Sequence, residues 1–145
     1  YDRLSIDYEN LVEAEGWLVT AETDSVTPTE QEGGGWSDGG QIFWTPTEPD
    51  KSLTLSFDVA EAGTYNILLV LTHSYDYGIF EFSLDGERLG DTLDLYHQVI
   101  AVREHYMGAR ELAAGKHTIT VKNAGKSAES KGYYFGFDGM VLSPK

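Results

Sequence analysis

Short segments in which apolar and polar residues alternate recur along this chain between turn residues, and they limit its fold more than any other feature. The alternation is clearest in "SLTLSFDV" (52–59), where four apolar residues are separated by polar ones. A period of two is typical of a half-buried β-strand. Helical periodicity is weak throughout, and the 16 glycines argue against long helices. The pattern therefore predicts an all-β protein.

Two further segments indicate how strands lie relative to the core. Alternation in "GIFEFSLDG" (78–86) places three apolar side chains on one face of a strand that ends in Asp85-Gly86. An Asp-Gly pair between strands is a hairpin signal. By contrast, "YNILLVLT" (65–72) is apolar on both faces, which predicts a strand in the centre of a sheet.

The spacing of the turns indicates the architecture. Turn signals recur about every 8–12 residues, which is the spacing expected of a β-sandwich. Strands are also expected at 117–123 and 134–142, and only 98–108 is compatible with a short helical turn. No linker and no internal repeat interrupts the chain. We expect one domain over residues 1–145, built as an antiparallel β-sandwich.

The charge balance excludes several classes of partner. Ten Lys and Arg residues against 24 Asp and Glu residues give a net charge of −14. This excess repels nucleic-acid backbones and anionic membrane surfaces, and no apolar run approaches the ~20 residues needed to cross a bilayer. Neither nucleic-acid binding nor membrane insertion is therefore expected. Cysteine is absent, which excludes disulfides. An acidic, cysteine-free, aromatic-rich composition suits a bacterial protein that is extracellular, periplasmic or on the cell surface.

Antiparallel pairing determines which loops lie together. Because adjacent strands run in opposite directions, successive turns alternate between the two ends of the sandwich. The short turns at 61–63 and 113–115 are expected at one end, and the longer loops at 45–51, 73–78 and 123–132 at the other. The second end would then gather half of the Trp and Tyr residues of the chain. These residues, with two neighbours, are Trp44, Tyr75, Asp76, Tyr77, Tyr96, His97, Tyr133 and Tyr134.

Such a cluster has the chemistry of a sugar site. The apolar C–H face of a pyranose ring stacks on Tyr or Trp, and its hydroxyls need polar side chains in the same plane. Since strands alternate, one residue of each pair Phe43/Trp44 and Tyr133/Tyr134 should face the core instead. The candidate ligand-binding residues are Trp44, Tyr75, Asp76, Tyr77, Tyr96, His97 and Tyr134.

Six segments, in order, resemble calcium-binding carbohydrate-binding modules of the family 6 and family 35 type. They are "VEAEG" (12–16), "GGQIFW" (39–44), "KSLTLSFDVAEAGTYNILLVLT" (51–72), "FSLDGERLG" (82–90), "LAAGKHTITV" (112–121) and "GFDGMVL" (136–142). The resemblance implies a jelly-roll sandwich of the galactose-binding-domain-like fold. It also implies a carbohydrate-binding accessory domain, joined to neighbouring domains of a bacterial glycoside hydrolase or related exported protein.

The resemblance further implies a structural calcium ion. In these modules, acids of the first strand and an Asp of the last strand meet at one calcium, and loop carbonyls complete the shell. Glu13 and Glu15, which share a face if they lie in a strand, and Asp138 match those positions, and carbonyls of 35–38 match the loop. The residue types alone favour a different arrangement, in which Glu13 and Glu15 are solvated on an edge strand and Asp138 pairs with a Lys or with backbone amides.

One position departs from the family pattern. The sugar cleft of family 6 modules uses an aromatic of the second-strand region, a second aromatic in a late loop, and an Asn just before the last strand. Phe43 or Trp44 matches the first, and Tyr96 or His97 could stand for the second. The Asn position falls near Gly136, which has no side chain.

Motifs for catalysis are not found in the sequence. It has no Gly-x-Ser-x-Gly elbow, no His-Glu-x-x-His helix and no Gly-rich phosphate loop. We therefore expect a non-catalytic module. The alternative is a structural spacer, docking or oligomerisation domain of a larger glycoside hydrolase, with no sugar binding of its own. The two hypotheses differ in whether Tyr75, Tyr77, Tyr96 and Tyr134 form a platform that faces solvent.

Overall fold

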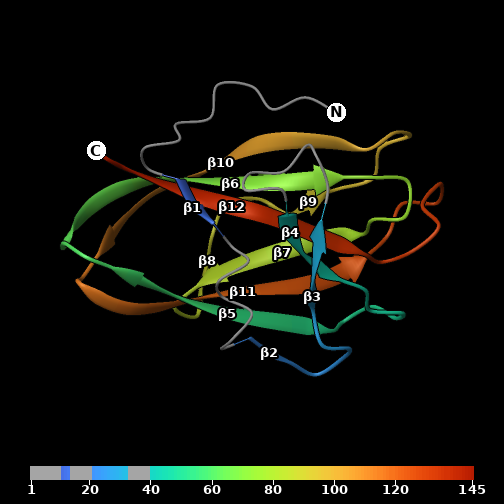
Figure 1. The fold of residues 1–145 in the computed structure, drawn as a ribbon, viewed down its shortest axis with the longest axis horizontal. Helices are drawn as coiled ribbons and strands as arrows, with labels where there is room; N and C mark the ends of the chain where they lie inside the picture. Colours follow the sequence, from blue (N-terminus) through green and yellow to red (C-terminus); the bar gives the residue numbers. More distant parts are fainter. Residues whose placement is uncertain (1–10, 14–20, 33–39) are drawn as a thin grey trace.

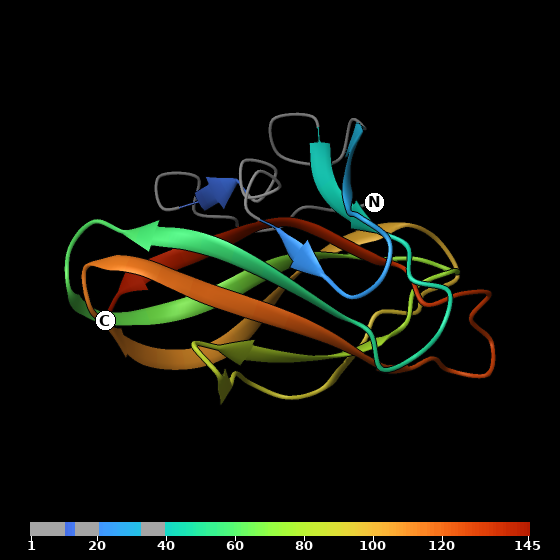
Figure 2. The same cartoon turned by 90° about the horizontal axis from the view of Figure 1, so that it is seen from below.

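The described part of the chain is a sandwich of two antiparallel sheets, each of six strands (Figures 1 and 2). The computed structural model describes residues 11–13, 21–32 and 40–145, and the regular structure in these ranges is entirely β-strand. The prediction of an all-β, antiparallel sandwich is confirmed. No helix long and apolar enough to cross a membrane occurs within the described ranges.

The first sheet, which we call the β6 sheet, has the strand order β10-β6-β12-β4-β3, and β1 pairs with β12. Its strands are β1 (Leu11–Glu13), β3 (Thr29–Glu32), β4 (Gly40–Trp44), β6 (Gly63–His73), β10 (Ala101–Leu112) and β12 (Phe135–Pro144). The strand predicted to be central, β6, lies between β10 and β12.

The second sheet, which we call the β11 sheet, has the strand order β2-β5-β11-β7-β8, and β9 pairs with β7. Its strands are β2 (Glu22–Thr23), β5 (Ser52–Val59), β7 (Ile79–Leu84), β8 (Glu87–Arg88), β9 (Leu93–Asp94) and β11 (Gly115–Gly125). The alternating segment 52–59 forms β5 along its whole length.

The core lies between the two sheets and is built from the alternating apolar residues. Phe80 and Phe82 of β7 are fully buried, as the pattern predicted, and Phe80 packs against Phe135 of β12 with ring centroids 4.9 Å apart. Burying one such side chain stabilises the fold by roughly 1.5–3 kcal/mol. Asp85 and Gly86 follow β7 with φ angles of 50° and 86°. Positive φ at both central residues is the geometry of the hairpin turn that Asp-Gly predicted.

The prediction that 98–108 could contain a short helical turn is wrong, because most of this segment belongs to strand β10. Residues 101–106 pair one by one with residues 68–73 of β6, and the register then shifts before Ala109. Gly108 lies in this irregularity with φ of +102°, which a glycine adopts without strain. The bulge breaks the period of two, so the strand pattern is weak in the sequence.

The loops separate to two ends, as predicted. At one end, which we call the turn end, Gly63 pairs with Leu112 and Gly115 pairs with Val59. At the opposite end, which we call the loop end, the longer loops lie together: the amide of Lys131 donates to the carbonyl of Tyr75. Figure 1 shows the tight turns at the left and the long loops at the right.

Candidate functional site

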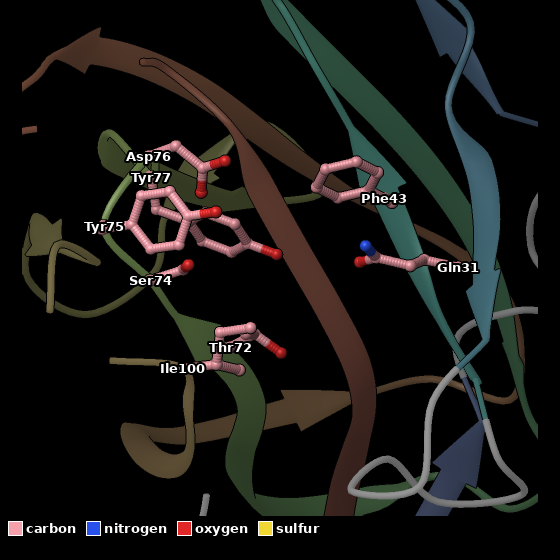
Figure 3. Close-up of a pocket in the computed structure, with 8 residues that line it drawn as sticks. All are labelled: Gln31, Phe43, Thr72, Ser74, Tyr75, Asp76, Tyr77 and Ile100. Atoms are coloured by element: carbon pink, nitrogen blue, oxygen red, sulfur yellow. The ribbon is translucent and has the colours of Figure 1, made fainter. Parts of the chain in front are cut away.

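A pocket of about 90 Å³ opens at the loop end, on the outer face of the β6 sheet. Leu71 of β6 and Ile42 of β4 point into the core, so their neighbours in the strands face outward. Figure 3 shows the lining side chains, which come from β3, β4, β6 and the loops beside them. They are Gln31, Phe43, Thr72, Ser74, Tyr75, Asp76, Tyr77 and Ile100. We call this site the loop-end pocket.

A buried polar network lies beneath the pocket and is centred on Gln41. The Gln41 carbonyl oxygen accepts a hydrogen bond from the Thr72 hydroxyl at 2.6 Å. The Gln41 amide nitrogen donates to Gln31 Oε1 at 2.8 Å and contacts the Tyr77 hydroxyl at 3.1 Å. Because each of these buried groups has a partner, the network holds the three strands and the following loop in one arrangement.

The Tyr77 hydroxyl lies directly over Gly136 of β12. A Cβ atom at position 136 would collide with this hydroxyl and would lie 2.5 Å from Gln41 Oε1. Only glycine fits, and the space of the expected Asn side chain is filled by Tyr77 and Gln41. Burial raises the pKa of Tyr77, against the opposing effect of its hydrogen bond to Gln41 and with a further increase from Asp76. The phenol is therefore protonated at neutral pH.

Aromatic rings form one wall of the pocket and part of its rim. Phe43 stacks on Tyr77 with centroids 6.3 Å apart, and meets Tyr134 edge to face at 5.6 Å. Tyr75 is 46% exposed at the rim, next to Asp76, and Ile100 is exposed on the same rim. The pocket thus offers an accessible ring together with a carboxylate, an amide and hydroxyls.

Three of the predicted binding residues, Tyr75, Asp76 and Tyr77, line the pocket. Their loop is tied down on one side, since the Ser74 amide donates to the Leu95 carbonyl and the His97 amide donates to the Ser74 carbonyl. Sequence reasoning missed Gln31, Gln41, Thr72, Ser74 and Ile100. Their only signal is a place on the outward face of a strand or in an adjoining loop, which many residues share.

The expectation for Trp44 needs correction. Its side chain has no exposed surface, packs near Phe80 at 6.3 Å, and donates its indole N–H to the Val26 carbonyl at 3.0 Å. It therefore offers no ring face to a ligand. Phe43, one residue earlier, is the member of the pair that faces the pocket. The choice depends on the phase of alternation in β4, which the sequence leaves open.

Tyr96 and His97 lie beside the loop-end pocket without lining it. The Tyr96 amide is held by the Asp94 carboxylate, and the His97 ring is held by the backbone of Val99. Tyr134 contacts Phe43 and lines a neighbouring hollow. The four tyrosines do not form one exposed platform, so this criterion does not support sugar binding over a spacer domain: Tyr75 is exposed, Tyr77 is only 3% exposed, and Tyr96 and Tyr134 are half-buried.

The predicted calcium ligands are only partly described. Asp138 is fully buried in β12, where the pairing with β6 shifts register between Phe137 and Gly139. Strand β1 pairs with β12, and Glu13 lies opposite Gly139, so the first and last strands do meet here. Glu15 and residues 35–38 lie outside the described residues. Within 11–13, 21–32 and 40–145, no group of three or more acidic or His residues is arranged to hold a metal ion.

The buried carboxylate of Asp138 in β12 is nevertheless a group that suits a calcium ion. A fully buried carboxylate is costly unless it is paired, hydrogen-bonded or bound to a metal, and Asp138 does have interactions within the fold. Calcium takes oxygen ligands from carboxylates and carbonyls. Asp138 would be the one ligand of such a site whose side chain the structure describes, and the backbone of Glu13 lies on the adjacent strand.

No protein-family model matches this sequence. No curated protein matches it either. Among solved structures, the fold is similar to part of a Paenibacillus xanthan lyase, with a TM-score of 0.82 and 24% identity over 94% of this chain. It is also similar to a family 35 carbohydrate-binding module from Clostridium thermocellum, with a TM-score of 0.56 and 19% identity over 92% of this chain. A third similar structure is a Podospora anserina GH26-CBM35 β-(1,4)-mannanase, with a TM-score of 0.59 and 18% identity over 93% of this chain.

The share of each matched protein that this chain spans differs strongly. The chain spans 98% of the Clostridium module, but only 13% of the xanthan lyase and 27% of the mannanase. At these identities the likeness establishes the fold alone, a β-sandwich of the kind found in carbohydrate-binding modules.

Proposed function

We propose that this chain is a non-catalytic carbohydrate-binding module that binds an oligo- or polysaccharide at the loop end. The observation that carries the proposal is the loop-end pocket, which combines the accessible ring of Tyr75 with the polar groups of Asp76, Ser74 and Gln31. Stacking on a tyrosine face suits the C–H face of a pyranose, and carboxylate, amide and hydroxyl groups suit its hydroxyls.

The proposal includes a structural calcium ion and a larger parent protein. Calcium held by Asp138, Glu13 and Glu15 would tie the first strand to the last. Attachment to neighbouring domains is supported by the small share of the xanthan lyase and mannanase chains that this fold occupies. The names of those enzymes, a xanthan lyase and a β-(1,4)-mannanase, also support the choice of a polysaccharide as partner. The proposal includes an extracellular, periplasmic or cell-surface location, which rests on the composition of the chain.

A glycan array on the calcium-loaded chain tests the sugar-binding proposal. The matched variants are Tyr75→Ala, at the pocket rim, and Tyr106→Ala, which removes a more exposed tyrosine (61% against 46%) that does not line the pocket. Wild type and Tyr106→Ala should bind the same glycans. Tyr75→Ala should bind at least about 10-fold more weakly, because it loses the stacking surface.

A blank array with folded wild-type protein would contradict sugar binding and favour the spacer or docking alternative. Equal binding by Tyr75→Ala and wild type would contradict this pocket as the site.

Calcium binding is tested separately by thermal unfolding with calcium and with a chelator. A ligand at 100 times its Kd stabilises the folded state by about 2.7 kcal/mol, so calcium should raise the Tm of wild type. Asp138→Asn should lose this increase, whereas Asp91→Asn, at an exposed position, should retain it. An increase that persists in Asp138→Asn would contradict the assignment of Asp138 to the metal.

A further inference from the structure

A second hollow lies beside the loop-end pocket, between the β4–β5 loop and the β11–β12 loop. It has a volume of about 160 Å³, and we call it the Tyr133 hollow. Its lining residues are Pro46, Thr47, Lys131, Gly132, Tyr133 and Tyr134. Pro46 is buried and both tyrosines are half-buried, whereas Thr47 and Lys131 are exposed. The hollow therefore combines an apolar and aromatic base with a hydroxyl and an ammonium group at its rim.

The residues that line the Tyr133 hollow are fixed to the loop that lines the first pocket. The Lys131 amide donates to the Tyr75 carbonyl at 3.0 Å, and the Tyr134 amide donates to the Asp76 carbonyl at 3.0 Å. A third hydrogen bond joins the same two loops: the buried hydroxyl of Ser130 donates to the Tyr77 carbonyl at 2.6 Å. These bonds hold the two loops at a fixed separation, so both sites are formed before a ligand arrives.

Close backbone packing reinforces this arrangement. A Cβ atom on Gly132 would lie 3.0 Å from the Asp76 carbonyl oxygen, which is tighter than ordinary van der Waals contact. Gly132 thus allows the β11–β12 loop to approach the β6–β7 loop closely. Asp76 has its side chain at the first pocket and its carbonyl against the lining of the second hollow.

The two sites share an aromatic wall. Phe43 lines the loop-end pocket, Tyr134 lines the Tyr133 hollow, and their rings meet at an interplanar angle of 87°. The ring centroids are 5.6 Å apart, so a residue that lines one site directly contacts a residue that lines the other. Adjacent pyranose units of a saccharide chain are joined by a single oxygen. Two adjacent sites are therefore suited to two adjacent units of one chain.

We propose that the Tyr133 hollow is a second saccharide subsite, which takes the pyranose unit next to the one held in the loop-end pocket. This inference rests on the proposed function and extends it. The tyrosine rings and Pro46 would contact the C–H face of the second unit, and Lys131 would donate hydrogen bonds to its oxygens. The ligand is therefore a segment of at least two units, and a monosaccharide fills only part of the site.

The charges of the two sites also differ. Asp76 is the acidic residue at the first, and Lys131 is the basic residue at the second. A carboxylate accepts hydrogen bonds and an ammonium group only donates them, so the two units are bound by opposite chemistry. The segment would accordingly bind in one direction along the two subsites.

Isothermal titration with saccharides of increasing length tests the second subsite. The probes are glucose, cellobiose and cellotriose, and mannose, mannobiose and mannotriose, each titrated into the full 145-residue chain. The readout is the ratio of trisaccharide to monosaccharide affinity. For wild type this ratio should be at least about 10, because a second stacked unit adds on the order of a tenfold gain.

Lys131→Met and Tyr133→Ala should each lower this ratio about 3- to 10-fold. Lys122→Met is the matched control, since it removes an exposed lysine of β11, and its ratio should equal that of wild type. Lys131 is exposed, so its side chain can change without loss of the fold even if Tyr133→Ala unfolds.

Three results would overturn the inference. A wild-type ratio near one, with binding still lost in Tyr75→Ala, would remove the second subsite and leave the proposed function intact. A high ratio that Lys131→Met and Tyr133→Ala do not change would place the second unit elsewhere. No binding of either series would remove both the proposed function and the subsite.

Discussion

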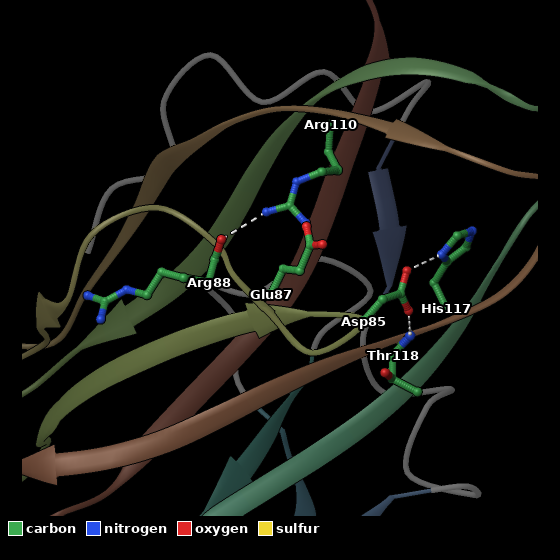
Figure 4. A network of polar contacts seen from close by, with 6 residues as sticks. All are labelled: Asp85, Glu87, Arg88, Arg110, His117 and Thr118. Carbon is green, nitrogen blue, oxygen red and sulfur yellow. Dashed lines mark hydrogen bonds and ion pairs between the residues drawn. The ribbon is translucent and has the colours of Figure 1, made fainter.

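The two ends of the sandwich are built from the same strands but closed in different ways. At the turn end, His117 lies between two acceptors. Its Nδ1 donates to Asp85 at 2.5 Å (Figure 4), and its Nε2 donates to the Ala113 carbonyl at 2.7 Å. Arg110 donates to the Arg88 carbonyl at 2.9 Å on the same side. At the loop end, long loops are joined by backbone hydrogen bonds around aromatic rings, and Tyr75 is left exposed.

Volume alone does not distinguish the two ends. A broad hollow of about 550 Å³ also lies at the turn end, larger than either hollow at the loop end. Its lining, Ala62, Gly63, Thr64, Glu111, Leu112 and Ala113, contains no aromatic ring. The difference therefore lies in chemistry: the turn end uses polar side chains to close the fold, whereas the loop end places aromatic rings and polar groups around its hollows.

The largest expected effect is a difference in the free energy of unfolding between variants of a buried and of an exposed aromatic residue at the loop end. Trp44→Ala should lower the free energy of unfolding by about 3–5 kcal/mol, because it leaves a large cavity in the core. Tyr75→Ala should change it by less than about 0.5 kcal/mol and still lose sugar binding. Urea unfolding measures both. Similar stability losses in the two variants would contradict the division between core and ligand-facing rings.

A second comparison concerns one glycine from each end. Gly136→Ala should cost about 1–3 kcal/mol and weaken sugar binding, because the new methyl group displaces Tyr77 and Gln41. Gly86→Ala meets no atom within 4 Å, so its cost of about 1 kcal/mol comes from the positive φ alone. Binding should survive in Gly86→Ala. If Gly136→Ala bound sugar as well as wild type, the arrangement of Tyr77 and Gln41 over Gly136 would not be needed for ligand binding.

Acid should weaken a histidine pair toward the loop end. His73 and His105 are joined through their Nε2 atoms at 2.8 Å, so at least one of the two rings must be neutral to accept the hydrogen bond. Burial, followed by the effects of His105, Arg103 and His97, lowers the pKa of His73 to about 4. In the unfolded chain this residue takes up a proton near pH 6.5. Between these values protons favour the unfolded chain, so stability falls as the pH drops from 6.5 to 4.

His73→Gln provides the test of this loss. From pH 7 to pH 5, wild type should lose about 1 kcal/mol more than His73→Gln, a value reduced for partial solvent exposure. Urea unfolding at the two pH values measures it, with His97→Gln as a control because its exposed ring is outside the pair. An equal loss in wild type and His73→Gln would contradict the neutral pair.

The histidine of the turn end should respond in the opposite direction and more weakly. The hydrogen bonds to Ala113 and then to Asp85 raise the pKa of His117. Desolvation raises the pKa of Asp85, but the hydrogen bonds from His117 and the Thr118 amide outweigh it, and the net pKa is lowered. The Asp85 contribution is thus present above pH ~3.8 and is lost as pH falls through its folded value.

The contribution of His117 is complete below pH ~6.5 and is lost as the pH rises through its folded value. Asp85→Asn should therefore cost about 0.5 kcal/mol at pH 6, since exposure of Asp85 weakens the pair, and less at pH 9. Thermal or urea unfolding measures this gap. A gap that widens at pH 9 would contradict a protonated His117.

Local patterns in the sequence were sufficient for most of the long strands, though not for β10, and for the placement of loops at two ends. The alternation in 52–59 gives β5 directly, and Asp85-Gly86 gives the hairpin, because both depend on neighbouring residues. The phase of alternation at Phe43 and Trp44 could not be predicted, since both are aromatic and either could face the core.

The pocket floor could not be predicted, because it depends on contacts between distant residues. Gln41 and Tyr77 are 36 positions apart, and their meeting over Gly136 requires the order β6-β12-β4 in one sheet. No residue type marks such a contact in advance. The family pattern suggested an Asn near position 136, and the structure replaces it with an amide from another strand.

Nuclear magnetic resonance mapping of a bound saccharide compares the two ends in a single experiment. Amide chemical shifts would be followed while a saccharide that the wild-type chain binds is added to ¹⁵N-labelled protein. We expect shifts in residues 72–78 and 131–136 at the loop end, and none in 85–88 or 113–118 at the turn end. Shifts confined to the turn end, or to the outer face of the β11 sheet, would contradict the assignment of ligand binding to the loop end.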